Sequence, residues 1–453
     1  MSHSKSDPAF IVASSTRRRF LKGAASTAFA APFVTSGLRA EPPSGKLNHA
    51  SFGAGGMAGA DIDSLSRSPH FNLVAAADVD VSRLDTLKQK FPNVRCYQDW
   101  RELLEKEGDK IDSVNVSTPD HMHGPIGMTA LGMGKHVYGQ KPLTQNLHEC
   151  RAVTLNAREA GVMTQMGIQV SSEFTERLGV AAVQAGAIGK VKEVHTFSNK
   201  KWGDMEPRPD RVDPIPDGFN WDYWLGVAED RPFLGGGYYH PGNWRKRRDF
   251  GTGTLGDMGC HIFSGWFRAL ALTTPISVQS FGPASNKDNW ATDGKVEYVY
   301  PRTEYTEGDT VKITWYDGDQ RPPESVEKAM GTIKLPGQGS VIIGTDGAML
   351  APHGSTPRFA RNGEEFRYKF PKLEPRNHYL EFVDCCREGK AKPSANFDYA
   401  GPLTEAVLLG CLASLFPQEL LQFDSEKVAF SNSEAATAAV RRSYRKGWEI
   451  AGF

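Results

Sequence analysis

Residues 47–59 of this chain read LNHASFGAGGMAG, which is an apolar strand followed directly by a glycine turn of the form G-x-G-x-x-A. A helical pattern comes next, over residues 61–66, and a second apolar strand, residues 73–77, ends in Asp78. That aspartate lies about 20 residues beyond the last glycine, as in a dinucleotide-binding fingerprint. We therefore predict a Rossmann domain that begins at Leu47.

The residues of the glycine turn have separate physical roles in holding a dinucleotide. Gly53 permits the tight turn, Gly55 lets the backbone approach the pyrophosphate, and Ala58 lets the helix pack closely on the strand. At the start of the helix, Gly56 and Met57 carry amides that are expected to donate to the phosphates. All five residues are predicted to form the cofactor-binding turn.

Asp78 and Arg83 bear on the choice of cofactor. Asp78 is expected to accept hydrogen bonds from the adenosine ribose, where a carboxylate repels the 2′-phosphate of NADP. Arg83 could instead stack on the adenine. The sequence thus favours NAD as the cofactor, with NADP as the less favoured alternative.

The alternation of strands and helices continues beyond this unit. Residues 80–90 and 99–107 have helical patterns, and residues 113–116 form an apolar strand. This alternation predicts a parallel sheet. Two further motifs follow, STPDHMH at residues 117–123 and HVYGQKPL at residues 136–143.

The glycine turn and these two motifs together resemble the Gfo/Idh/MocA family of oxidoreductases, from about Leu47 to Phe416. The resemblance implies that Lys141 lies beside the nicotinamide and the substrate. Gln140 stands where the family usually has Glu, and its neutral amide can still hydrogen-bond the nicotinamide ribose. The other cofactor contacts expected in these motifs are Ser117, Thr118, Pro119 and His123.

The pattern changes near residue 165, so we assign residues 47–165 to the Rossmann domain and 166–453 to a second domain for substrate binding and oligomerisation. The elements expected in the second domain are a helix at 173–185, strands at 311–316 and 341–344, and a closing helix at 397–416. This mixture predicts an α+β domain with a large, open and mainly antiparallel sheet. The fold class is α/β.

A second signature lies at residues 251–261, GTGTLGDMGCH. It resembles the second motif of the same family, whose Asp and His map onto Asp257 and His261. On a helix these two side chains lie on one face, because they are four residues apart. We expect His261 to act as the general base and Lys141 to stabilise an alkoxide, while Asp257 fixes the tautomer of the histidine or binds a substrate hydroxyl.

Three residues are candidates for substrate contact. Gln169 lies at the expected domain junction, although it could equally be a turn residue. His240 and Trp244 belong to an aromatic and polar segment that suits a sugar-sized pocket, and an ordinary loop is the alternative. No metal site is expected, because His121 and His123 share one loop and are better placed to contact the cofactor or substrate.

The N-terminus resembles a twin-arginine export signal. Residues 16–22 read TRRRFLK and precede a mildly apolar, alanine-rich run. We assign the signal to residues 1–40 and a linker to 41–46. The run is shorter than the roughly 20 apolar residues that span a bilayer, so no stable membrane span is expected. We expect a periplasmic protein, or one otherwise exported by this route.

The composition excludes other classes of protein. Lys plus Arg and Asp plus Glu both total 53, so no large net field attracts nucleic acid. Six scattered cysteines form neither a disulfide scaffold nor a C-x-x-C metal motif.

The resemblance implies an NAD-dependent oxidoreductase that acts on the CH–OH group of a sugar, polyol or sugar derivative. Hydride would pass to a tightly bound nucleotide, in what we expect to be a homo-oligomer. One alternative is a redox-neutral, NAD-dependent glycoside hydrolase of the same family. A non-catalytic sugar-binding or assembly protein is the alternative from another class.

Overall fold

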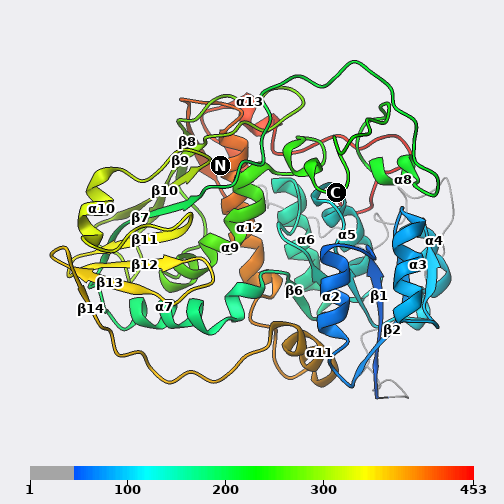
Figure 1. Cartoon of the computed structure of the whole chain (residues 1–453), viewed down its shortest axis with the longest axis horizontal. Coiled ribbons are helices and arrows are strands. Elements are labelled where there is room, and N and C mark those ends of the chain that lie inside the picture. Colours follow the sequence, from blue (N-terminus) through cyan, green and yellow to red (C-terminus); the bar gives the residue numbers. More distant parts are fainter. Residues whose placement is uncertain (1–44) are drawn as a thin grey trace, which may run out of the picture. The chain divides into compact units, whose positions relative to one another are not determined.

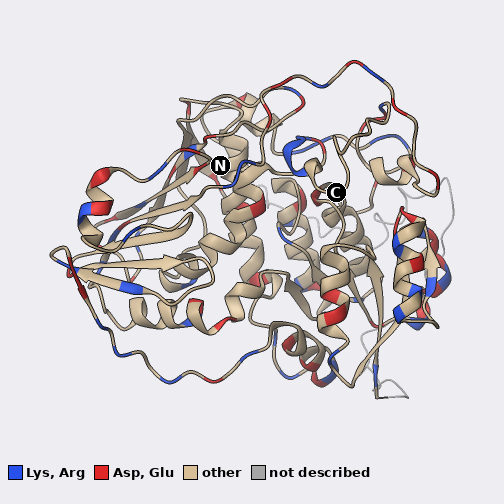
Figure 2. Ribbon diagram, viewed as in Figure 1, with Lys and Arg blue, Asp and Glu red and all other residues tan. Residues whose placement is uncertain are grey.

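The computed structural model describes residues 45–453 (Figure 1). The export signal predicted at residues 1–40 and most of the predicted linker lie outside the described residues. Within residues 45–453, no helix combines the length and the apolar character needed to cross a bilayer. Figure 2 shows residues of both charge signs interspersed along the outer helices α3 (Val81–Lys90) and α4 (Trp100–Glu107).

The first sheet has six parallel strands in the order β3-β2-β1-β4-β5-β6, which is the doubly wound order of a Rossmann fold. Its strands are β1 Leu47–Phe52, β2 Phe71–Ala77, β3 Arg95–Tyr97, β4 Ser113–Val116, β5 His136–Gly139 and β6 Thr164–Met166. The helices between them, besides α3 and α4, are α2 Met57–Leu65, α5 His123–Gly132 and α6 Leu147–Ala160. The predicted parallel sheet is confirmed.

Local capping chemistry sets the starts of several of these helices. Asp80 accepts a hydrogen bond from the backbone of Ser82 before α3, and Asp99 accepts one from Arg101 before α4. The first helix differs from the prediction, since α2 begins at Met57 rather than near residue 61. The chain enters this helix directly from the glycine turn, so its first residues belong to the turn motif itself.

The second sheet has ten strands in the order β14-β13-β12-β11-β7-β10-β9-β8-β15-β16. Only the β7–β10 pair is parallel among the described strands of this sheet, which confirms the mainly antiparallel prediction. The strands are β7 Val191–Ser198, β8 Ser277–Ser280, β9 Lys295–Pro301, β10 Thr310–Asp317, β11 Gln338–Gly344, β12 Ala348–Pro352, β13 Arg358–Arg361, β14 Glu364–Phe366, β15 Leu420–Asp424 and β16 Ala429–Phe430.

After β6 the described chain also forms helices, some of which pack on this sheet. The helices are α7 Phe174–Gln184, α8 Trp221–Leu225, α9 Gly253–Ala269, α10 Glu324–Met330, α11 His378–Glu388, α12 Phe397–Ala413 and α13 Glu434–Ala438. On α9, Phe263 packs edge-on against Trp315 of β10. Gly259 lies against Val407 of α12, where a methyl group would come within 2.9 Å of its side chain. Thus α9 is sandwiched between the sheet and α12.

The C-terminal part of the chain returns to the first domain. Helix α11 packs on α2 and β1, and the Arg442 guanidinium donates to Glu149 of α6 at 2.6 Å. Tyr444 donates to the same carboxylate at 2.8 Å. Residues 166–453 therefore include segments that help to build the dinucleotide domain, which the linear division of the chain did not predict.

Candidate active site

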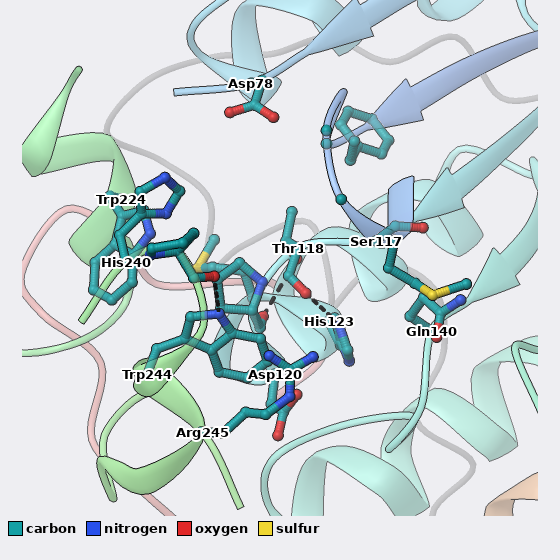
Figure 3. A pocket seen from close by; sticks show the side chains of 18 of the residues that line it. Asp78, Ser117, Thr118, Asp120, His123, Gln140, Trp224, His240, Trp244 and Arg245 are labelled. Carbon is teal, nitrogen blue, oxygen red and sulfur yellow. Dashed lines mark hydrogen bonds between the residues drawn. The ribbon is translucent and has the colours of Figure 1, made fainter. Parts of the chain in front are cut away.

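A cavity of about 580 Å³ lies at the carboxyl ends of β1, β4 and β5, where the order of the parallel strands reverses. This is where doubly wound folds bind their ligands. Figure 3 shows Asp78 at one end of the cavity and Trp244 and Arg245 at the other. Helix α9, the 3-10 helix η4 (Asn243–Lys246) and the chain after β7 supply the wall opposite the Rossmann strands.

The glycine turn forms the cavity wall that follows β1. Gly53 has φ of 100°, and a Cβ there would lie 2.7 Å from the Ser117 carbonyl oxygen and 2.9 Å from the Ala58 Cβ. Only glycine fits this close approach of turn, helix and neighbouring strand. Gly53, Gly55, Gly56 and Met57 line the cavity, while Ala58 is buried behind them.

Asp78 lies at the end of β2, as predicted. Its Oδ2 accepts from the Ala54 amide at 2.8 Å and its Oδ1 from the Asp80 amide at 3.0 Å. Burial raises the pKa of Asp78, and the charge of Arg83 partly offsets that rise. These bonds hold the carboxylate against the glycine turn, at the ribose position of the fingerprint.

Arg83 lies across Gly55, where its Cδ would be 2.8 Å from a Cβ on the glycine. Its guanidinium Nη2 is 3.0 Å from Nε2 of His240. Both residues line the cavity near Asp78, so the structure places His240 at the nucleotide end. His240 therefore lines the cavity beside Arg83, and its predicted contact with substrate stays a prediction.

The motif after β4 forms the floor of the cavity. Ser117, Thr118, Pro119 and His123 all line it. Nδ1 of His123 is 2.7 Å from the Pro142 carbonyl oxygen, and its Nε2 is 2.8 Å from that of Thr118. His123 thus ties the loop after β4 to the loop after β5. His121 does not line the cavity, since its Nε2 hydrogen-bonds the Trp224 carbonyl in an aromatic cluster.

Gln140 lies beside a buried carboxylate that sequence reasoning missed. Its Nε2 donates to both oxygens of Asp61, at 3.1 and 2.9 Å. The hydroxyls of Ser117 and Tyr379 donate to the same carboxylate at 2.8 and 3.1 Å. Burial raises the pKa of Asp61 to about 6, against these hydrogen bonds. A glutamate at position 140 would set two carboxylates against each other, which explains the neutral amide.

Lys141 and Asp257 meet at the far end of the cavity. The lysine Nζ lies 2.8 Å from Oδ1 of Asp257 and 2.7 Å from its carbonyl oxygen. Nε of Arg245 donates to the same Oδ1 at 2.8 Å. Burial alone raises the pKa of Asp257, but Lys141 and Arg245 outweigh it and hold the pKa below its usual range. The carboxylate is therefore ionised and fixes both cations.

His261 lies one turn further along α9, so the two motifs converge as predicted. Burial, Lys141 and His353 hold the pKa of His261 well below its ordinary value, so the imidazole is neutral. Its buried Nδ1 has no hydrogen-bond partner among residues 45–453. Asp257 does not fix its tautomer, because the carboxylate is taken up by Lys141 and Arg245.

The structure also corrects the substrate candidates. Trp244 lines the far end of the cavity, whereas Gln169 does not line it. The Gln169 amide instead donates to Tyr379 at 3.0 Å. Sequence reasoning missed several lining residues that come from distant loops: Asp120, Lys200, Trp202, Tyr223 and His353. Of these, only Asp120 belongs to a recognised motif.

No group of three or more His, Cys, Asp or Glu side chains that could hold a metal ion occurs in the described part of the chain.

The fold and cavity define a two-domain protein built around an NAD-binding Rossmann domain. Residues 47–168 match the sequence model of GFO_IDH_MocA, the oxidoreductase family with an NAD-binding Rossmann fold. The matched residues include all six strands of the first sheet, so the first domain is similar to the dinucleotide-binding domain of that family.

Known proteins resemble parts of this chain. The scyllo-inositol 2-dehydrogenase (NAD(+)) of Bacillus subtilis is 30% identical over 122 residues, which cover 27% of this chain and 35% of that protein. The α-N-acetylgalactosaminidase of Shewanella oneidensis is 29% identical over 119 residues, or 25% of this chain and 26% of that protein. The chain spans less than half the length of the curated relatives it matches.

The fold likeness extends further than the sequence likeness. The crystal structure of aldose-aldose oxidoreductase from Caulobacter crescentus superposes with a TM-score of 0.57 and 17% identity. It covers 83% of this chain and 100% of the other. The second sheet is therefore part of the same two-domain fold.

Proposed function

We propose that the protein is an NAD-dependent oxidoreductase that acts on the CH–OH group of a sugar, polyol or sugar derivative. One observation carries the proposal: Lys141, Asp257 and His261, from two distant motifs, meet in the cavity that the glycine turn opens into. The partial likeness to an inositol dehydrogenase supports the substrate class.

The residues of the cavity fit a dinucleotide. Gly53 has no side chain, so the backbone of the turn can approach a phosphate closely. The turn leads into the N-terminus of α2, whose amides can donate to phosphate oxygens. Asp78 offers carboxylate oxygens for the ribose, and the Ser117–Pro119 loop and Gln140 lie further along the cavity. When bound, NAD supplies the hydride acceptor.

The residues at the far end suit proton handling and charge stabilisation. The neutral imidazole of His261 takes the proton of the substrate hydroxyl. The ammonium of Lys141, held by Asp257, stabilises negative charge on the resulting oxygen. Asp257 thereby orients the lysine, and Arg245 shares the same carboxylate oxygen.

Alanine variants of this unit test the assignment. His261→Ala and Lys141→Ala are each expected to slow reduction of bound NAD by a sugar at least about 100-fold. NAD affinity should change less than about threefold, and the double variant should lose little more than either single variant because the residues act together. Full activity in both single variants would remove the assignment, and purified protein that neither retains nor binds NAD would favour the non-catalytic alternative.

The preference for NAD over NADP rests on Asp78. Asp78→Ala removes the carboxylate that accepts the Ala54 and Asp80 amides and repels a 2′-phosphate. We expect weaker binding of NAD and a smaller discrimination against NADP, measured by titration of cofactor-free protein. Tighter binding of NADP by the unaltered protein would contradict the assignment.

A redox-neutral glycoside hydrolase is the second candidate, and the partial match to an α-N-acetylgalactosaminidase favours it. Such a reaction transiently oxidises the sugar, eliminates the aglycone and returns the hydride. With a glycoside deuterated at the oxidised carbon, turnover should then be slowed, proceed without added NAD and retain the label. Stoichiometric accumulation of free NADH would instead indicate a simple dehydrogenase.

A further inference from the structure

The far end of the cavity carries more cations than its carboxylates neutralise. Lys141, Lys200 and Arg245 line it, together with two carboxylates, Asp257 and Asp120. Oδ2 of Asp120 is already hydrogen-bonded to the Thr252 hydroxyl at 2.7 Å. One positive charge therefore remains without a matching carboxylate among the lining residues.

Lys200 is the cation with the weakest partner. Its Nζ lies 3.7 Å from Oδ2 of Asp257, beyond hydrogen-bond distance, and its side chain is 41% exposed. By contrast, Lys141 is 14% exposed and makes two short bonds. The ammonium of Lys200 is therefore the group best able to accept a new anionic partner.

Arg245 is held in a fixed position beside it. The guanidinium carbon lies 4.3 Å from the ring centre of Trp244 and 5.5 Å from that of Trp202. Its Nε is occupied by Asp257, while Nη1 makes only a 3.4 Å contact with the Gly242 carbonyl. Figure 3 shows the arginine side chain reaching into the cavity next to Trp244. A guanidinium fixed in this way recognises a planar carboxylate without further loss of side-chain freedom.

The neighbouring histidines are neutral and do not change this balance of charges. Burial, Lys200 and Lys141 lower the pKa of His353, and His261 is neutral for similar reasons. The rings of His261 and His353 lie 5.8 Å apart and border the same part of the cavity. An anion bound here would meet neutral imidazoles and the ammonium of Lys200, whose Nζ lies 3.7 Å from the Asp257 carboxylate.

We propose that the substrate is an acidic sugar or polyol whose carboxylate is bound by Lys200 and Arg245. This inference rests on the proposed function and narrows its substrate class. A single carboxylate matches the single surplus charge, and Trp202 and Trp244 line the same part of the cavity as the arginine that they hold. A neutral sugar would leave the Lys200 ammonium without an anionic partner of its own.

A matched pair of ligands tests this class. Methyl α-D-glucopyranosiduronate and methyl α-D-glucopyranoside differ only in the substituent of C5, which is a carboxylate in the first and a hydroxymethyl group in the second. We expect the NAD-loaded protein to bind the acid at least about tenfold more tightly by calorimetry. Equal or tighter binding of the neutral glycoside would overturn the inference, and tighter binding of glucose 6-phosphate than of the uronate would overturn the choice of a carboxylate.

Two neighbouring lysines provide the variant and its control. Lys200→Gln should reduce the acid-to-neutral affinity ratio about tenfold. Lys201→Gln should leave it unchanged, because Lys201 pairs with Asp319 at 2.5 Å and does not line the cavity. An unchanged ratio in Lys200→Gln with an unaltered melting temperature would overturn the role of Lys200.

The binding readout separates the two proposals. If the acid binds selectively but neither ligand reduces bound NAD, the proposed oxidation of this hydroxyl pattern fails while the acidic substrate class stands. If neutral sugars reduce bound NAD and the acid is not preferred, the oxidoreductase stands and the acidic class fails.

Discussion

Asp61 is a carboxylate in helix α2 that is buried and has a raised pKa. It is fully buried, accepts hydrogen bonds from Gln140, Ser117 and Tyr379, and has a pKa raised by burial from 3.8 to about 6. Because the folded state holds the proton more tightly than the unfolded state, its contribution to stability is complete below the unfolded pKa. That contribution is lost as the pH rises through about 6.

The pH dependence of stability checks this assignment. The unfolding free energy of the unaltered protein minus that of Asp61→Asn should fall by about 3 kcal/mol between about pH 3 and 7. Chemical denaturation across this range measures it. Asp63→Asn, which removes an exposed carboxylate of the same helix, is the control. A difference independent of pH would show that folding does not raise the pKa of Asp61.

At the scale of elements, the junction of β1 and α2 depends on one glycine. Gly53→Ala adds a methyl group 2.7 Å from the Ser117 carbonyl oxygen, at a φ of 100°. We expect a loss of about 3 kcal/mol in unfolding free energy and weakened NAD binding. Gly127→Ala in α5 is the control, because no atom lies within 4 Å of the added group and alanine favours a helix. Similar melting temperatures for the two variants would contradict this account.

Element boundaries were predictable where the deciding chemistry is local. The helices predicted at residues 80–90 and 99–107 begin within one residue of α3 and α4, since Asp80 and Asp99 cap them. The ten-strand order was not predictable in the same way. It places β7 between β10 and β11, which follow more than 100 residues later in the sequence. The periodicity of a strand shows which of its faces is buried, but it does not show which distant strand pairs with it.

At the scale of the whole molecule, we propose export by the twin-arginine route. Replacing Arg17 and Arg18 by lysine should leave the protein in the cytoplasm, folded and with its cofactor bound. Cell fractionation measures this, and the chain without substitutions is the control. Unchanged periplasmic localisation would contradict the proposal.

The homo-oligomeric state stays a prediction that light scattering of the purified protein checks.

The dinucleotide domain and the meeting of Lys141, Asp257 and His261 in one cavity followed from the linear sequence because short motifs specify them. The glycine turn and Asp78 belong to one strand–helix–strand unit, and Lys141 and His261 each lie in a short motif of their own. Their positions in the structure agree with these expectations, and Asp257 lies beside Lys141.

Long-range packing settled the electrostatics of the site. Asp61 accepts a hydrogen bond from Gln140, which is 79 residues away in the sequence. Asp257 accepts from Lys141 and does not orient His261. The Gln169 amide donates to Tyr379 and does not reach the cavity. Lys200 follows β7 and His353 follows β12, and both line the cavity although they are more than 100 residues apart in the sequence. Burial and the competition of cations for one carboxylate determine charge and orientation, and both arise only when distant segments meet in a low-dielectric interior.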